Sequence, residues 1–238
     1  MTTDPLLLTG EVDDATARLL RTVAAFDSAH IAAASLLPGW TRGHVLAHLA
    51  RNADGFVNLF TAARTGERLP MYASAAARGA DIEAGASRSP AAHLDDVRRS
   101  AERLTEAVDA MPAEAWTATV ETPRGPRVAA LLVWGRLREI EVHHFDLAAG
   151  YRPDGWPEGF GHRLLHEVAT DLTGRPDVPP MVLRFDGSRH QLAIGDPEGA
   201  PTVTGPAPEL AAWLIGRSRG ETLTVTPDGP LPTPPEWI

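Results

Sequence analysis

Apolar residues recur at three- and four-residue spacing through the first two-thirds of the chain, the pattern of amphipathic helices. Pro38-Gly39 separates the first two helices, and Thr41 is suited to cap the N-terminus of the second. Ser89-Pro90 opens the third helix. The predicted helices cover residues 11–35, 42–65, 90–111 and 128–149. Four helices of this length, joined by connections that allow antiparallel neighbours, predict a four-helix bundle.

Two segments between these helices lack a clear helical period. Residues 66–89 are rich in Ala, Gly and Arg, so we expect a long loop with at most a short helical turn. Long loops of this kind often act as lids over functional sites. Residues 118–127 alternate and contain Pro123, Gly125 and Pro126, which predicts a hairpin or an extended loop.

The composition changes after Tyr151, where Pro and Gly become frequent and short β-type segments follow. Asp186-Gly187 is a hairpin turn signal between two of them. The expected elements are helices at 159–172 and 208–217 and strands at 181–185, 191–194, 201–204 and 222–226. The fold class is therefore α+β, with a helical bundle over residues 1–152 and a small α+β domain over residues 153–238.

Charge and hydropathy narrow the possible partners. The formal net charge is −9, and no block of Lys or Arg interrupts the acidity. Binding of nucleic acid and of anionic membrane surfaces is therefore disfavoured. No signal peptide and no apolar run of membrane-spanning length is present, so we expect a cytoplasmic protein. Because both domains can cover their apolar faces internally, we expect a monomer.

The chain contains no cysteine. This excludes disulfides, Cys-ligated zinc, iron–sulfur clusters and a Cys nucleophile. Any thiol chemistry must therefore use a thiol that arrives as a small molecule.

Two of the predicted helices carry His and Glu at helical spacing. His44 and His48 lie four residues apart on the second helix, whereas the fourth helix offers Glu139 with His143, or Glu141 with His144. Bundles build metal sites from such inward-pointing pairs, and zinc accepts His and carboxylate ligands. Spacing alone does not decide between the two pairs on the fourth helix, and a hydrogen-bonded His between helices is the plainer alternative.

Two segments extend this interpretation. LPGWTRGHVLAHLARNADG and REIEVHHFDLAAGY resemble the signature segments of the mycothiol-dependent maleylpyruvate isomerase family, whose members combine a DinB-like metal-binding bundle with a sterol-carrier-like C-terminal domain. By position, the resemblance implies His48, Glu139 and His143 as ligands of a divalent metal, zinc by ligand type. His44 and His144 have no counterpart and are expected in packing or around the ligands. Asp146 is expected either to accept the second N–H of His143 or to form a salt bridge at the end of the helix.

The resemblance also implies a reaction and a second functional residue. The family's C-terminal domain provides an arginine that is thought to face the metal, and Arg217 fits that position best, with Arg219 as the competing choice. The implied activity is isomerisation of maleylpyruvate to fumarylpyruvate, with mycothiol as the thiol cosubstrate and a small electrophile as substrate. A mycothiol S-transferase, a metal-dependent hydrolase and a non-enzymatic binding module are the alternatives.

Overall fold

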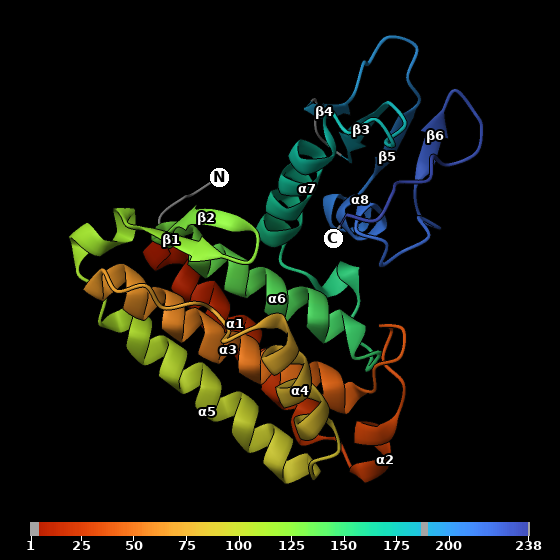
Figure 1. The fold of residues 1–238 in the computed structure, drawn as a ribbon. Helices are drawn as coiled ribbons and strands as arrows, with labels where there is room; N and C mark the ends of the chain where they lie inside the picture. Colours follow the sequence, from red (N-terminus) through yellow and green to blue (C-terminus); the bar gives the residue numbers. More distant parts are fainter. Residues whose placement is uncertain (1–4, 187–189, 238) are drawn as a thin grey trace. The chain divides into compact units, whose positions relative to one another are not determined.

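The computed structural model describes residues 5–186 and 190–237 and divides the chain into two units, residues 2–150 and residues 151–238 (Figure 1). The first unit is helical and the second combines two helices with a small sheet. The α+β class predicted from the sequence is confirmed. Within the described residues, no helix is both long enough and apolar enough to cross a membrane.

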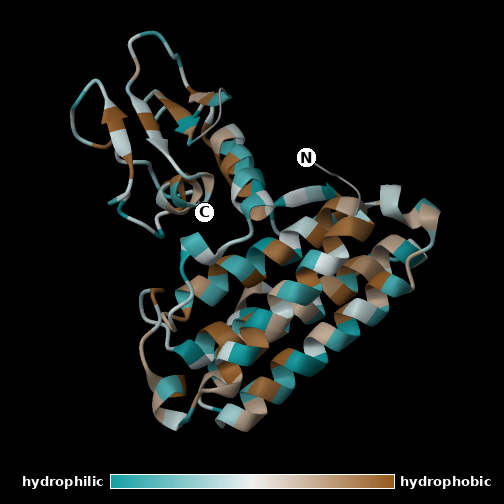
Figure 2. Ribbon diagram, turned by 180° about the vertical axis from the view of Figure 1, so that it is seen from behind, coloured by the Kyte–Doolittle hydropathy of each residue, from teal (hydrophilic) through white to brown (hydrophobic). Residues whose placement is uncertain are grey.

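Four long helices form a bundle in the first unit: α1 (Pro5–Ala24), α3 (Arg42–Thr65), α5 (Pro90–Asp109) and α6 (Leu132–Asp146). Helix α1 packs on α6 and α5, and α3 packs on α5 and α6, so that the four helices enclose one core (Figure 1). Figure 2 shows apolar and hydrophilic residues alternating around these helices, as expected for helices that each bury one face. Leu19, Leu49 and Ile140 are among the fully buried side chains of this core.

Local signals set the ends of α3 and α5 as the sequence predicts. The Thr41 side chain accepts a hydrogen bond from the backbone N–H of His44, and Gly66 ends α3 in the left-handed conformation at φ 76°. Ser89 caps α5 in the same way, with Pro90 in its first turn. These helices therefore begin where the sequence places them.

The first predicted helix, 11–35, is wrong at both ends. Helix α1 begins at Pro5, which is tolerated in a first turn, and buries Leu8. It ends at Ala24 because Asp27 starts a separate short helix, α2 (Ser28–Ala32), by accepting a hydrogen bond of 2.8 Å from the backbone N–H of His30. Residues 1–4 lie outside the described part of the chain.

The long loop expected at residues 66–89 is also wrong, because the segment contains the three-turn helix α4 (Ala75–Ala86), capped by Ser74. This helix crosses α3 at small residues. A Cβ at Gly43 would lie 2.0 Å from the carbonyl oxygen of Ala86, and one at Gly85 would lie 2.9 Å from the Cβ of Ala47. The Ala- and Gly-rich composition that resembles a loop is thus what allows two helices to approach closely.

Helix α6 is shorter than the predicted 128–149. Its expected first residue, Val128, belongs to β2 (Gly125–Val128), which pairs antiparallel with β1 (Thr119–Thr122), and a short 3₁₀ turn follows before Leu132. At the other end Ala148 has φ 52°, which ends the helix before Gly150. The hairpin predicted at 118–127 is confirmed.

The second unit contains a four-stranded sheet with strand order β4-β3-β5-β6. Strand β3 pairs antiparallel with β4 and parallel with β5, and β5 pairs antiparallel with β6. Helices α7 and α8 pack on each other, with α7 against β4 and α8 against β5. Their bounds are β3 (Met181–Phe185), β4 (Gln191–Ile194), β5 (Thr202–Gly205), β6 (Thr224–Thr226), α7 (Glu158–Leu172) and α8 (Ala207–Leu214). The elements lie within a few residues of the prediction, while Gly187 of the predicted turn is outside the described residues.

Candidate metal centre

Contacts at the ends of α3 and α6 bring the two signature segments together. Arg42, in the first turn of α3, donates from Nε to the carbonyl oxygen of Leu147 at 2.6 Å and from Nη2 to that of Ala148 at 2.7 Å. These carbonyls follow the last turn of α6, where a cationic side chain is favourable. The N–H of Leu36 donates to the carbonyl oxygen of Asp146 at 2.9 Å. The beginning of α3 is therefore fixed against the end of α6.

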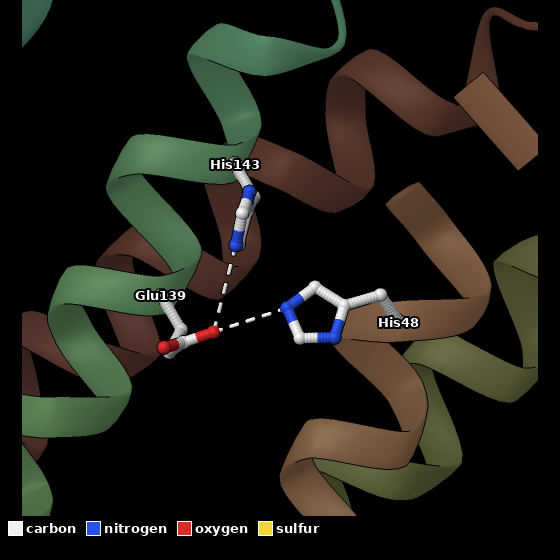
Figure 3. A group of neighbouring side chains, drawn as sticks. All are labelled: His48, Glu139 and His143. Carbon is white, nitrogen blue, oxygen red and sulfur yellow. Dashed lines mark hydrogen bonds and ion pairs between the residues drawn. The ribbon is translucent and has the colours of Figure 1, made fainter. Parts of the chain in front are cut away.

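His48 from α3 meets Glu139 and His143 from α6 (Figure 3). His48 Nε2 lies 3.1 Å from Glu139 Oε2, and His143 Nε2 lies 3.5 Å from the same oxygen. The two imidazole rings are 4.7 Å apart between centroids and nearly perpendicular, at 88°. Three ligand atoms from two helices thus converge on one point.

The spacing of these atoms fits a tetrahedral metal. Ligand atoms about 2.1 Å from a tetrahedral zinc ion lie about 3.4 Å from one another, close to the 3.1 and 3.5 Å that separate Glu139 Oε2 from the two imidazole nitrogens. Two imidazoles and one carboxylate also form a known zinc ligand set that leaves a fourth position open. The residues present therefore suit a divalent metal in both donor type and spacing.

Asp146 supports the triad from the other side of His143. Its Oδ2 lies 2.9 Å from His143 Nδ1, and the side chain is fully buried. Carboxylates in this position hold a ligating imidazole with its Nε2 towards the metal. Of the two roles expected for Asp146, the structure shows the contact with His143.

The three side chains of the triad shift one another's pKa values. Burial lowers the pKa of His48 to about 4, against the opposing effect of Glu139. Burial also acts to lower the pKa of His143, but hydrogen bonds to Asp146 and Glu139 outweigh it and raise the value to about 9. Burial acts to raise the pKa of Glu139, yet the hydrogen bonds from His143 and His48 hold it well below its ordinary value. At neutral pH the carboxylate is therefore charged, His48 is neutral and His143 is protonated, so a metal would bind with release of a proton from His143.

The model of the mycothiol maleylpyruvate isomerase N-terminal domain matches residues 12–148, and that of the MDMPI C-terminal domain matches residues 155–236. The chain belongs to the mycothiol maleylpyruvate isomerase family.

Two solved structures of this family are similar over their full lengths. The mycothiol-dependent maleylpyruvate isomerase is 30% identical with a TM-score of 0.92, and the match covers 100% of both chains. A mutant of a mycothiol-dependent maleylpyruvate isomerase, with one histidine replaced by alanine, is 29% identical with a TM-score of 0.91, again over 100% of both chains. No curated protein sequence matches the chain. The resemblance found in the two signature segments is thus confirmed along the whole chain.

The second His–Glu pair of α6 lies on another face of the helix, towards α1. Glu141 is fully buried and forms an ion pair with Arg18, and His144 Nε2 lies 2.8 Å from Thr22 Oγ1. His44 lies 3.1 Å from Glu83 of α4. The residues without a counterpart in the family motif thus join α6 to α1 and α3 to α4.

His144 gives the stability of the bundle a specific pH dependence. Burial, with the charges of Arg18 and Arg21, lowers its pKa from 6.5 to about 4. Between these values the unfolded chain takes up a proton that the folded chain does not, so stability falls as pH falls through this window. Between pH 6.5 and about 4 we expect the parent to lose about 2 kcal/mol more unfolding free energy than His144→Gln, measured by urea unfolding. A variant whose pH profile equals that of the parent would contradict this.

Arg217 follows α8 in the second unit. Its side chain is half-buried and donates from Nη1 to the carbonyl oxygen of Ile215 at 3.1 Å, whereas Arg219 is exposed. These contacts describe its surroundings within that unit, and its role in the reaction stays a prediction.

Two residues close to the triad were not singled out from the sequence. Arg78 of α4 places Nη2 3.0 Å from His48 Nδ1, and Arg136 of α6 donates to Asn52 Oδ1 at 2.7 Å behind the site. Asn52, one turn after His48 on α3, is buried. Arg136 could have been noticed as a cation on the helical face of Val133 and Ile140, but nothing in the composition of residues 66–89 marks Arg78.

Proposed function

We propose that this chain is a mycothiol-dependent cis–trans isomerase of the maleylpyruvate type, with a divalent metal, zinc by ligand type, held by His48, Glu139 and His143. The observation that carries the proposal is the convergence of these three side chains in a chain that a mycothiol-dependent maleylpyruvate isomerase matches over its full length. The absence of cysteine from the chain is consistent with a thiol supplied by the cosubstrate. Low-molecular-weight thiols stay reduced in the cytoplasm, which we propose as the site of action.

The metal would lower the pKa of an incoming thiol, so that it reacts as a thiolate near neutral pH. Residues of the chain would set the charge and the orientation of the ligands around the bound thiol. Glu139 contributes one negative charge, and Asp146 holds the imidazole of His143. Trp40, with its ring centroid 5.7 Å from that of His48, adds an aromatic surface next to the site.

In the proposed reaction the thiolate adds to one carbon of the cis double bond. A C–S bond forms, the π electrons move onto the conjugated carbonyl oxygen as an enolate, and the former double bond becomes free to rotate. Collapse of the enolate re-forms the double bond in the trans arrangement, and the thiolate leaves. No redox change occurs and the thiol is regenerated. We propose that Arg217 binds a substrate carboxylate and stabilises the negative charge of the enolate.

The test is an assay of the metal-loaded chain with maleylpyruvate, with and without mycothiol, in which product geometry is read by nuclear magnetic resonance. We expect fumarylpyruvate to form only when the thiol is present. A stable thiol adduct would indicate an S-transferase instead. Product formation without thiol would indicate a hydrolase or another thiol-independent reaction, and would contradict the proposal.

A further inference from the structure

Arg78 contacts one of the candidate ligands from outside the two helices that carry the triad. It lies in the first half of α4, and its Nη2 is 3.0 Å from His48 Nδ1. Its guanidinium also lies over the ring of Tyr72, with Cζ 5.6 Å from the ring centroid. Both residues belong to the segment between α3 and α5, so one side of the site is built from this segment.

Among the described residues, no carboxylate forms an ion pair with Arg78. Its neighbours differ in this respect, since Arg51 pairs with Asp54 and Asp96, and Arg88 also pairs with Asp96. A divalent metal and Glu139 would together carry one positive charge, and Arg78 would add a second. The metal and Arg78 would therefore attract an anionic group of the substrate.

The contact between Arg78 and His48 depends on the tautomer of the imidazole. An arginine only donates, so His48 Nδ1 must accept, and Nε2 then carries the proton and donates to Glu139. A metal on Nε2 requires the opposite tautomer, with the proton on Nδ1. Two donors would then face each other across the 3.0 Å contact, so the guanidinium would turn from His48 and present its N–H to another acceptor in the site.

Tyr72 fixes where the guanidinium can go. Its ring packs against α3 at Gly55, where an added Cβ would lie 3.1 Å from Tyr72 Cε1. Burial raises the pKa of Tyr72 and the charge of Glu139 raises it further, while hydrogen bonds with Arg78 and Asn52 act to lower it. The phenol is therefore neutral and anchored, with its ring face towards Arg78.

We propose that Arg78 binds a carboxylate of the substrate beside the metal, and that Tyr72 is its positioning residue. The inference rests on the proposed function and deepens it, because it assigns a residue of the segment between α3 and α5 to the binding of the substrate. A planar guanidinium binds a carboxylate through two parallel hydrogen bonds, which fixes orientation as well as charge.

The test uses succinate, a saturated dicarboxylate that cannot add a thiol, titrated calorimetrically into the metal-loaded full chain without mycothiol. We expect Arg78→Gln to weaken succinate binding about 10- to 100-fold, the range for hydrogen bonds between charged groups, with metal content unchanged. Arg78→Lys should recover only part of the affinity. Arg68→Gln, an exposed position in the same segment, is the matched control and should bind as the parent does.

Two variants test whether the aromatic ring of Tyr72 positions Arg78. Tyr72→Leu should weaken succinate binding about 3- to 10-fold through loss of the cation–π contact, and Tyr72→Phe, which keeps the ring, should restore it. Equal weakening in both variants would overturn the positioning role.

The outcomes separate this inference from the proposed function. If the parent does not bind succinate, or if Arg78→Gln binds it as tightly as the parent does, the role of Arg78 is overturned even when thiol-dependent isomerisation is observed. Arg78-dependent binding of succinate without thiol-dependent isomerisation supports the anion site and refutes the isomerase.

Discussion

Glu139→Gln is expected to lower the affinity of the chain for zinc by more than about 100-fold and to abolish thiol-dependent turnover, while the fold is retained. The carboxamide keeps the size of the side chain and an acceptor for both imidazoles, but it removes the one negative charge among the three candidate ligands. Loss of a carboxylate that only supports a ligand costs about 10- to 100-fold in affinity, so loss of a ligand should cost more. Zinc competition with a chromophoric chelator measures this directly.

The chain contains a matched control for this substitution. Glu83 Oε2 lies 3.1 Å from His44 Nε2, the same separation as between Glu139 and His48, but at an exposed carboxylate outside the triad. Glu83→Gln should therefore leave zinc affinity and turnover at parental values. Zinc binding by Glu139→Gln with the parent's affinity would refute the metal centre as assigned.

Arg18→Ala is expected to have the opposite profile, with lower stability and normal zinc affinity. Glu141 is fully buried, and Arg18 of α1 is its charge partner. Removal of one partner of a buried ion pair leaves a charge in a poorly solvating environment, which costs about 3 kcal/mol or more. Urea unfolding of the zinc-free chain should show this loss of unfolding free energy.

Glu141→Gln combined with Arg18→Met distinguishes the cost of a broken pair from the value of the pair itself. Because the double variant leaves no charge unpaired, it should recover much of the stability lost in Arg18→Ala. If Arg18→Ala is as stable as the parent, the charge of Glu141 is stabilised by groups other than Arg18. Loss of zinc from either variant would show that the two faces of α6 are not independent.

Much of the fold could be predicted from local signals. Caps at Thr41 and Ser89 mark the beginnings of α3 and α5, and short β-type segments with a turn signal at Asp186 mark the strands of the second unit. The failures have tertiary causes. Helix α4 was not predicted because its small residues serve a close crossing with α3, and that crossing involves residues far apart in the sequence.

The candidate site shows the same division. The sequence alone determined the chemistry that is available: no cysteine, two His and Glu pairs on α6, one His pair on α3, and the motif that favours His48, Glu139 and His143. The tertiary structure decided which face of α6 meets α3, because helical spacing makes Glu139 with His143 and Glu141 with His144 equivalent until their neighbours are known. It also placed Arg78 beside His48, since a contact across 30 residues depends on how α4 packs and leaves no periodic trace in the chain.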